Sequence, residues 1–407
     1  MSTNDLLKVY DPAALRASLT SVIRLKRMRE YTTASTDSNP LLAKLRSTNP
    51  NTIPTDPATT AALQVIPIDA TTLKNRGMHA TRALPSYHRS WHVTRVVAGH
   101  DAPVHCVCVD SSNDWFVSGS ADRTVKVWDL VTGKLKLTLT GHIQAVRGVS
   151  LSGRIPYMFT CSEDKTVRCW DLERNEVVRT YHGHLGGVYS IAIHPDLDLI
   201  ATGGTDGAVR VWDIRTRKEI YALLGHKEAV QCLLMQSSEP QIVSGGADAM
   251  VRLWDLAAGR CYPDGILTQH KRGIRCMAWS PLDYTMASCS SDSLRKWRLP
   301  SGKYLHSFEG GACAAEGGGD TAPLSGLDIP HSCAVNPLGV FVTGHASGAV
   351  KFFDWASAQC FSTPERVTPQ LGSRDSEGSV MAMTFDGSGS RLITGHGDKT
   401  LRVWVEQ

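Results

Sequence analysis

The chain has 407 residues and a net charge of +4, and 42% of its residues are hydrophobic, which is ordinary for a globular protein with a sizeable core. It contains no run of eighteen apolar residues and does not open with the charged-then-apolar pattern of a signal peptide, so we expect an intracellular protein without a membrane span. Its eleven cysteines are scattered without a C-x-x-C pair, which predicts reduced, buried thiols and neither a zinc site nor a disulfide framework.

Charge is distributed unevenly along the chain. Residues 1–90 hold 12 Lys and Arg against 6 Asp and Glu, whereas the remainder holds 31 against 33. A basic arm therefore precedes a nearly neutral body.

The first part of this arm, residues 1–33, predicts a short basic amphipathic helix. In "DPAALRASLTSVIRLKRMREY", Asp11 suits an N-cap and Pro12 suits the first helical position. One face of the helix would be apolar, with Leu15, Leu19, Val22 and Ile23. The basic residues that we expect to contact a partner are Arg24, Lys26, Arg27 and Arg29.

Three interpretations of this helix compete: a docking helix in a partner's groove, a nuclear localisation or RNA-contacting patch in "RLKRMR", and an organelle transit peptide. The acidic residues Asp5, Asp11 and Glu30 disfavour the transit peptide. Residues 34–90, with "STDSNP" and "RSTNPNTIPTDPATT", show little periodicity and predict a flexible linker. Such an arm on a rigid body is typical of a tether within a larger assembly.

The body, residues 91–407, repeats itself. Trp128, Trp170, Trp212 and Trp254 are each separated by 42 residues. Gly-His pairs at His100, His142, His184 and His226 keep the same spacing, and His270 follows after 44 residues with Gln269 before it. Trp297, Phe353 and Trp404 occupy the same slot in three further units, which makes seven. A Gly-His followed by Trp-Asp at a period of about 40 to 45 residues is the WD40 signature, in which each unit is a four-stranded propeller blade.

Local patterns agree with this assignment. Short runs such as "VHCVCVD" and "TVKVW" alternate with turn residues and lack helical periodicity. Each blade must be covered by its neighbours, and a closed ring covers the last one. Since little chain follows Trp404, we expect residues 92–99, "HVTRVVAG", to supply the outer strand of blade seven. The predicted fold class is therefore all-β: a seven-bladed WD40 propeller behind a basic, mostly extended arm with one short helix.

One set of polar residues recurs in each of five blades. An indole N–H only donates, a carboxylate only accepts, and a hydroxyl and an imidazole can bridge them, so a buried structural network explains the repetition better than a hydrolase triad. The expected structural tetrads are His100, Ser118, Asp122 and Trp128; His142, Thr160, Asp164 and Trp170; His184, Thr202, Asp206 and Trp212; His226, Ser244, Asp248 and Trp254; and His270, Ser288, Asp292 and Trp297.

The last two blades depart from the pattern. Blade six lacks the Gly-His and has Ser347 where Asp is expected, and blade seven keeps Thr394, Asp398 and Trp404 without the Gly-His. The Gly-rich residues 310–326 and the Ser-rich residues 362–378 predict extended surface loops, which are either partner sites or tolerated insertions.

The residue just after the start of each inner strand should face the mouth of the ring. This set is basic, aromatic and amide without a carboxylate, which favours docking of an acidic or peptide-like partner over a merely solvated rim. The expected partner-binding residues of the ring are His105, Arg147, Tyr189, Gln231 and Arg275.

"GSADRTVKVWDLVTGKLKLTLTGHIQAVRGV", "EDKTVRCWDLERNEVVRTYHGHLGGVY" and "SDSLRKWRLPSGK" resemble the pleiotropic-regulator family of spliceosomal WD40 proteins from about Trp91 to Trp404. "SLTSVIRLKRMREY" is similar, more loosely, to the family's N-terminal helix. The resemblance implies a nuclear, non-enzymatic scaffold that binds splicing proteins of the nineteen complex, and small nuclear RNA or pre-mRNA through the basic arm. It implies no catalytic residue, cofactor, metal, membrane or small-molecule substrate.

Two rival functions stay open on the sequence. "VRVWDIR" ends in Trp-Asp-x-Arg and resembles the box by which WD40 substrate receptors dock onto a cullin-RING ubiquitin ligase, with Asp213 and Arg215 as contact residues. A signalling scaffold resembling G-protein β subunits ranks lower, because a long coiled-coil heptad would be expected in place of one basic helix and a linker.

Overall fold

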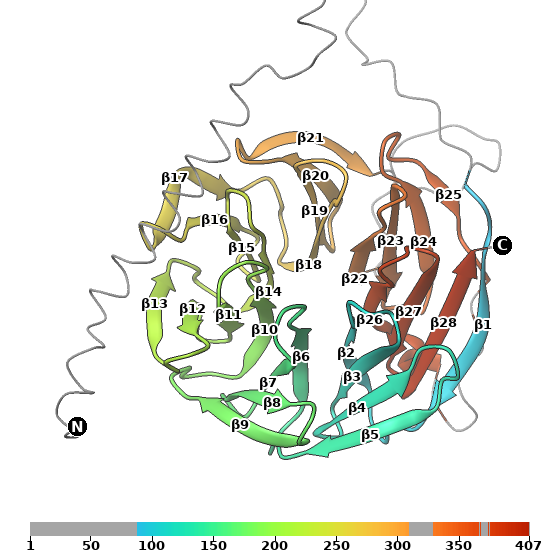
Figure 1. Ribbon diagram of the computed structural model, residues 1–407. Helices are drawn as coiled ribbons and strands as arrows, with labels where there is room; N and C mark the ends of the chain where they lie inside the picture. The colour runs from blue at the N-terminus through green and yellow to red at the C-terminus, as the bar shows by residue number, and fades with distance from the viewer. Residues whose placement is uncertain (1–87, 309–328, 366, 368–372, 374, 407) are drawn as a thin grey trace, which may run out of the picture. The chain divides into compact units, whose positions relative to one another are not determined.

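Short β-branched and apolar runs form the strands, and Asp, Asn and Gly turns separate them, as their propensities predict. The computed structural model describes residues 88–308, 329–365, 367, 373 and 375–406. Within these residues the chain forms seven four-stranded antiparallel sheets, arranged as blades around one axis (Figure 1). The predicted seven-bladed propeller is thereby confirmed. The arm and its basic residues lie outside the described residues.

Each blade is ordered a to d from the axis outward, and the inner strands a contact one another in sequence around the ring. Blade one comprises β2 Val104–Val109, β3 Trp115–Ser120, β4 Thr124–Asp129 and β5 Leu135–Thr140. Blade two comprises β6 Val146–Leu151, β7 Tyr157–Ser162, β8 Val167–Asp171 and β9 Glu176–Tyr181. Blade three comprises β10 Val188–Ile193, β11 Leu199–Gly204, β12 Ala208–Asp213 and β13 Glu219–Leu224. Blade four comprises β14 Val230–Met235, β15 Ile242–Gly246, β16 Val251–Asp255 and β17 Arg260–Leu267.

Blade five comprises β18 Ile274–Trp279, β19 Thr285–Ser290, β20 Leu294–Arg298 and β21 Lys303–Phe308. Blade six comprises β22 Pro330–Val335, β23 Val340–His345, β24 Val350–Asp354 and β25 Cys360–Ser362. Blade seven comprises β26 Val380–Phe385, β27 Arg391–His396, β28 Thr400–Glu406 and β1 Trp91–Ala98. The 3-10 turn η2 Asp375–Gly378 precedes β26. Among the described residues, no helix has the length and apolarity needed to cross a membrane.

The core lies between neighbouring blades. Strands b are covered on both faces, and β11, β19 and β23 are buried at every position. The outer strands are more exposed, as β5 and β9 show. Each sheet therefore buries both faces only because another sheet lies on either side.

Strand β1 closes the ring. It pairs antiparallel with β28, from Trp91 opposite Glu406 to Ala98 opposite Thr400. The Trp91 indole stacks on Phe352 of blade six, with ring centroids 5.4 Å apart. The segment that precedes blade one is therefore the outer strand of blade seven, so the two ends of the propeller are held together by backbone hydrogen bonds and indole packing.

A buried cation lies between blades five and six. Lys296 on β20 occupies the position held by Val127 in blade one, and it is 6% exposed. Its Nζ donates to the Trp355 carbonyl at 2.8 Å and lies 4.4 Å from the centroid of that indole. Burial lowers the pKa of Lys296 from its usual 10.5 to about 8, against the opposing pull of Asp283 and Asp354.

This lowered pKa predicts a pH-dependent difference in stability between the protein and Lys296→Met. Below the folded pKa both states are protonated, so the full cost of the buried charge falls on the folded state. Between pH 8 and 10.5 the folded state loses the proton first, and this cost disappears. Thermal unfolding from pH 7.5 to 10 should therefore show the parent gaining stability relative to Lys296→Met as the pH rises. Lys227→Met, at an exposed position, is the control, and a constant difference for Lys296→Met would contradict the prediction.

Candidate interaction face

The expected tetrads form one hydrogen-bonded chain in each of blades one to five. In blade one the Trp128 indole N–H donates to Ser118 Oγ at 2.8 Å, and this oxygen lies 2.7 Å from His100 Nε2. His100 Nδ1 lies 2.7 Å from the Asp122 carboxylate. In blades two to five the Nε2 distances are 2.7 or 2.8 Å and the Nδ1 distances are 2.9 to 3.2 Å.

Because an ionised carboxylate only accepts, Nδ1–H must donate to it, and in a neutral imidazole Nε2 is then an acceptor. The hydroxyl therefore accepts from the indole and donates to Nε2. The pKa values agree with a neutral imidazole and an ionised carboxylate. Burial lowers the pKa of His184 below its usual value despite the neighbouring carboxylate. Burial alone would raise the pKa of Asp206, but hydrogen bonds from the His184 ring and from the Leu185 and Ala208 N–H groups hold it below its usual value.

The tetrad hydroxyls are unsuited to nucleophilic chemistry. Ser118, Thr160, Thr202, Ser244 and Ser288 are all 0% exposed. Each already accepts from an indole, and no substrate atom reaches a group that is fully enclosed. The network instead holds the loop that carries the His against the turn that carries the Asp.

Blades six and seven replace the missing loop histidine from within strand b. His345 Nε2 lies 2.9 Å from Thr343 Oγ1, and His396 Nε2 lies 2.8 Å from Thr394 Oγ1. Both imidazoles are buried. From the sequence, we expected these blades to lack a Gly-His in the loop before strand a. The Gly-His pairs within strand b, in "VTGHAS" and "ITGHGD", which place the imidazole two residues after the hydroxyl, were overlooked.

In blade seven the carboxylate has a new partner. The Asp398 side chain accepts from Arg402 Nη2 at 2.6 Å, and both are buried. Burial, assisted by the Arg402 charge, lowers the pKa of His396 to about 4. The hydrogen-bonded unit therefore persists with a different set of donors and acceptors.

The predicted rim residues share one backbone feature. In every inner strand the register shifts between the first and third residues, so the second residue is a β-bulge without a cross-strand partner. A bulge re-aims a side chain that would otherwise follow the pleat. The seven bulged residues are His105, Arg147, Tyr189, Gln231, Arg275, His331 and Met381. The last two were missed from the sequence because no Gly-His in the preceding loop marks the start of strand a in their blades.

The bulged residues interact across blade boundaries. The Arg147 guanidinium lies 5.2 Å from the centroid of the Tyr189 ring, and its Nε donates to Glu163 at 2.7 Å. Arg275 Nη1 lies 3.2 Å from His331 Nδ1. Burial and the Arg147 charge lower the pKa of His105 to about 4, so this imidazole is neutral at pH 7. None of the seven bulged residues is acidic, but Glu163 in the b-to-c turn of blade two brings a carboxylate to Arg147.

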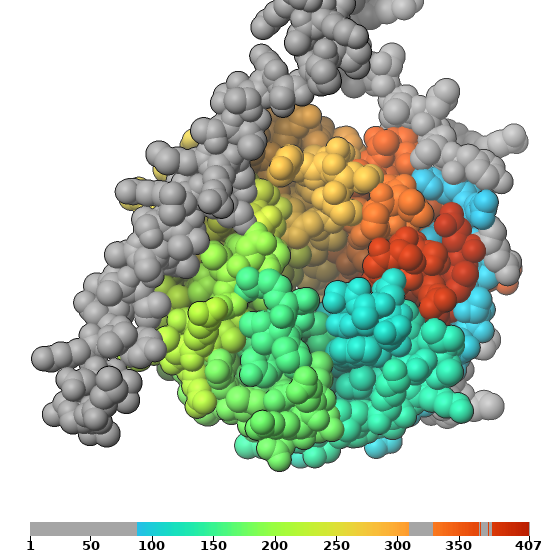
Figure 2. Space-filling view, viewed as in Figure 1, coloured from blue at the N-terminus to red at the C-terminus, as the bar shows by residue number. Residues whose placement is uncertain are grey.

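The loops and turns joined by the tetrads form one face of the ring, which we call the tetrad face: the d-to-a loops and the b-to-c turns. Next to the blade-two and blade-three histidines, Ile143 and Leu185 are 71% and 78% exposed. Their backbone N–H groups donate to Asp164 and Asp206. The backbone that carries these exposed aliphatic side chains is therefore held in place, four residues before Arg147 and Tyr189 respectively. The space-filling view shows the visible side of the ring hollowed at its centre (Figure 2).

The residues of the proposed ligase-adaptor box lie on the opposite face, where a-to-b loops and c-to-d turns meet. Asp213 is 7% exposed, and its carboxylate accepts from the Arg215 N–H and the Thr216 hydroxyl. The Arg215 side chain pairs with Asp198 at 2.6 Å but is 80% exposed. Asp213 therefore stabilises its own turn, and only Arg215 is available to a partner.

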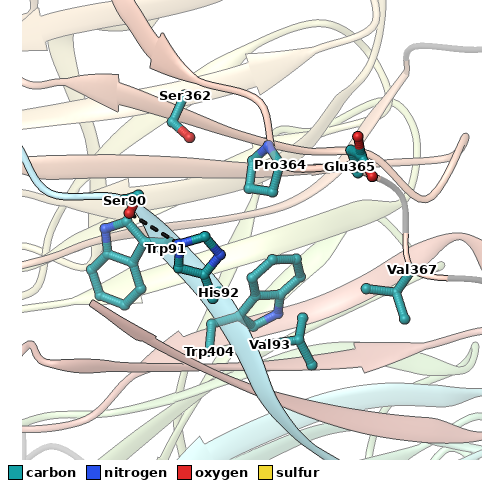
Figure 3. A pocket seen from close by; sticks show the side chains of 9 residues that line it. All are labelled: Ser90, Trp91, His92, Val93, Ser362, Pro364, Glu365, Val367 and Trp404. Atoms are coloured by element: carbon teal, nitrogen blue, oxygen red, sulfur yellow. Dashed lines mark hydrogen bonds between the residues drawn. The ribbon is translucent and has the colours of Figure 1, made fainter. Parts of the chain in front are cut away.

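A recess of about 380 Å³ adjoins the closing strand (Figure 3). Trp91, Trp404 and Val93 supply apolar surface, and Glu365 supplies a carboxylate. Nearby, the His88 imidazole stacks on Phe361 at 4.5 Å. Ser90 Oγ and His92 Nε2, 3.0 Å apart, also line the recess, which gathers packing surface around the closing strand.

Asp206→Ala tests the structural role of the tetrads. The change removes the acceptor of His184 Nδ1 and of the Leu185 N–H, so the folded protein should lose about 1 to 3 kcal/mol of stability. Chemical denaturation would measure this loss, with the exposed Asp114→Ala as control. Equal stability of the two variants would show that the network adds nothing.

Comparison with known proteins agrees with this architecture. The WD domain, G-beta repeat family matches residues 91–129, 133–171, 175–213, 217–255, 261–298 and 369–405. These ranges omit residues 299–368, which contain β21 and all four strands of blade six. Blade six is the blade in which His345, Ser347 and Phe353 replace the usual residues.

The similar proteins with curated names are splicing factors and pleiotropic regulators. The chain is 53% identical over 326 residues to pre-mRNA-splicing factor PRP46 of Candida glabrata, which covers 79% of this chain and 72% of that protein. It is 50% identical over 323 residues to protein pleiotropic regulator PRL2 of Arabidopsis thaliana, covering 79% and 64%. It is 51% identical over 349 residues to human pleiotropic regulator 1, covering 85% and 64%. The resemblance noted in the sequence is thus confirmed, and the chain belongs to the family of WD-repeat proteins that includes pre-mRNA-splicing factor PRP46 and the pleiotropic regulators.

Proposed function

We propose that this protein is a non-enzymatic scaffold subunit of the spliceosome, located in the nucleus, that supports pre-mRNA splicing by holding splicing-factor proteins of the nineteen complex. Family membership is the observation that carries the proposal, since the relatives include proteins named as pre-mRNA-splicing factors. The ring supports it physically, because its recurring Ser, His and Asp side chains are enclosed and committed to the fold.

The partner surface is the part of the tetrad face over blades two and three. Interfaces favour Arg and Tyr anchors surrounded by apolar contacts. Here Arg147 is held between Glu163 and the Tyr189 ring, so little side-chain freedom is lost when a partner binds. Ile143 and Leu185, each four residues before one of these two side chains in the sequence, add exposed apolar area. A partner segment with aliphatic residues and a carboxylate fits this combination.

The basic arm provides the second contact. Arg24, Lys26, Arg27 and Arg29 would pair with phosphates of small nuclear RNA or pre-mRNA, or with an acidic protein groove. Binding through phosphates weakens steeply with salt, whereas the tetrad face binds largely through apolar area. The two contacts are therefore separable by salt and by RNase.

No observation on the described residues favours the ligase-receptor alternative. Asp213 is occupied within its own turn, and the relatives named above carry splicing or pleiotropic-regulator names.

The test is affinity purification of the tagged protein from nuclear extract, with and without RNase, followed by mass spectrometry. We expect nineteen-complex proteins to be recovered with the parent and to survive RNase. Changing both Ile143 and Leu185 to Asp should reduce their recovery about tenfold, which corresponds to about 1.4 kcal/mol of binding free energy. Both side chains are exposed, so thermal stability should be unchanged.

Leu282→Asp is the matched control, because Leu282 is 57% exposed in an a-to-b loop on the opposite face. Full recovery with the double variant, or an equal loss with Leu282→Asp, would place the partner surface elsewhere. Recovery of a cullin and its adaptor without splicing factors would overturn the scaffold function in favour of the ligase receptor.

A further inference from the structure

Three thiols meet at the boundary between blades five and six. Cys276 lies on β18, Cys289 on β19 and Cys333 on β22, and the three Sγ atoms lie within 4.8 Å of one another. Cys289 is fully buried, Cys276 is 9% exposed, and Cys333 is partly exposed on an inner strand. The proposed function makes no use of this cluster.

The cluster arises from one substitution in the repeat. The strand-b position of Cys289 is glycine in five blades, at Gly119, Gly203, Gly245, Gly344 and Gly395. In blade two it is Cys161, which faces Gly148. Only blade five opposes a cysteine with a cysteine, Cys276 opposite Cys289, and the neighbouring inner strand adds Cys333.

The surroundings keep these thiols uncharged. Burial raises the pKa of Cys276 and of Cys289 well above the usual 9.0. The cluster packs among Leu294, Phe308 and Phe341. Among the described residues, no imidazole or carboxylate joins the three sulfur atoms as a further ligand. Any species bound here must therefore react with neutral thiols and leave no net charge in an apolar site.

The requirement for no net charge determines which oxidation state of a bound centre fits three thiolates. A monovalent or divalent ion on three thiolates would leave a buried negative charge, and zinc in structural sites takes four protein ligands. A trivalent thiophilic centre on three thiolates is neutral. We propose that Cys276, Cys289 and Cys333 form a binding site for trivalent arsenic, supplied as arsenous acid.

The reaction balances without an oxidant or reductant. Three As–S bonds form while three As–O and three S–H bonds break, and each thiol proton leaves with a hydroxide as water. Arsenic remains trivalent throughout. Cys333 provides access, since it is the partly exposed member of the cluster.

The test is titration of the purified, reduced full-length protein with arsenous acid, followed by native mass spectrometry and by X-ray absorption at the arsenic edge. We expect one arsenic per chain, a mass gain of one arsenic minus three hydrogens, and three sulfur neighbours. Cys289→Gly should lower the apparent affinity at least tenfold. This variant restores the residue found in five other blades, so the fold should persist.

Cys161→Gly is the matched control, because it makes the same change at the equivalent position of blade two and should bind like the parent. Cys276→Ser is a second variant that should also lose binding, with the serine that blades three and six carry at this position. Binding that survives both cluster variants, or no three-sulfur arsenic in the parent, would overturn the site. Equally tight, Cys289-dependent binding of Cd²⁺ would overturn the charge argument.

Discussion

The hydroxyl of each tetrad is the group on which the architecture depends. It accepts from a strand-c indole and donates to an imidazole, and in blades one to five the second nitrogen of that imidazole reaches the carboxylate of the b-to-c turn. Strand b, strand c and the loop from the preceding blade are thereby joined through one buried point. Because the hydroxyl and the imidazole are buried, moving the loop would leave several polar atoms unpaired at once.

This fixation gives the loops of the proposed partner surface a defined conformation. The bulge at the second residue of every inner strand lies just beyond the loop that the tetrad holds. The Arg147 and Tyr189 side chains therefore start from backbone with little freedom, and Glu163 holds the guanidinium further. A rigid presentation of this kind suits a scaffold, since less ordering entropy is lost on binding.

The side chains at the boundary between blades five and six differ most from those at the equivalent positions of the other blades. It contains Lys296 on β20 and the thiol cluster, and it adjoins a blade whose tetrad imidazole, His345, comes from strand b. The same region contains Trp355, which receives the Lys296 ammonium on its carbonyl and its ring. Blades one to four place an apolar residue at the position of Lys296, whereas this boundary places a charged side chain there.

The sequence alone determined the number of blades, the tetrad membership in five of them, and the closing strand near residues 92–99, because each depends on short patterns repeated at a fixed period. It also determined the family, since the blade-specific segments are long enough to be distinctive. Only the tertiary structure showed that His345 and His396 contact the strand-b hydroxyls of blades six and seven. In blades one to five the histidine at this place comes from the loop before strand a, which is distant in sequence from strand b. The Arg147 to Glu163 pair and the approach of Cys333 to Cys276 and Cys289 were likewise decided by the tertiary structure. Cys276 and Cys289 are cross-strand partners at a spacing that the repeat sets, whereas Cys333 comes from the neighbouring blade.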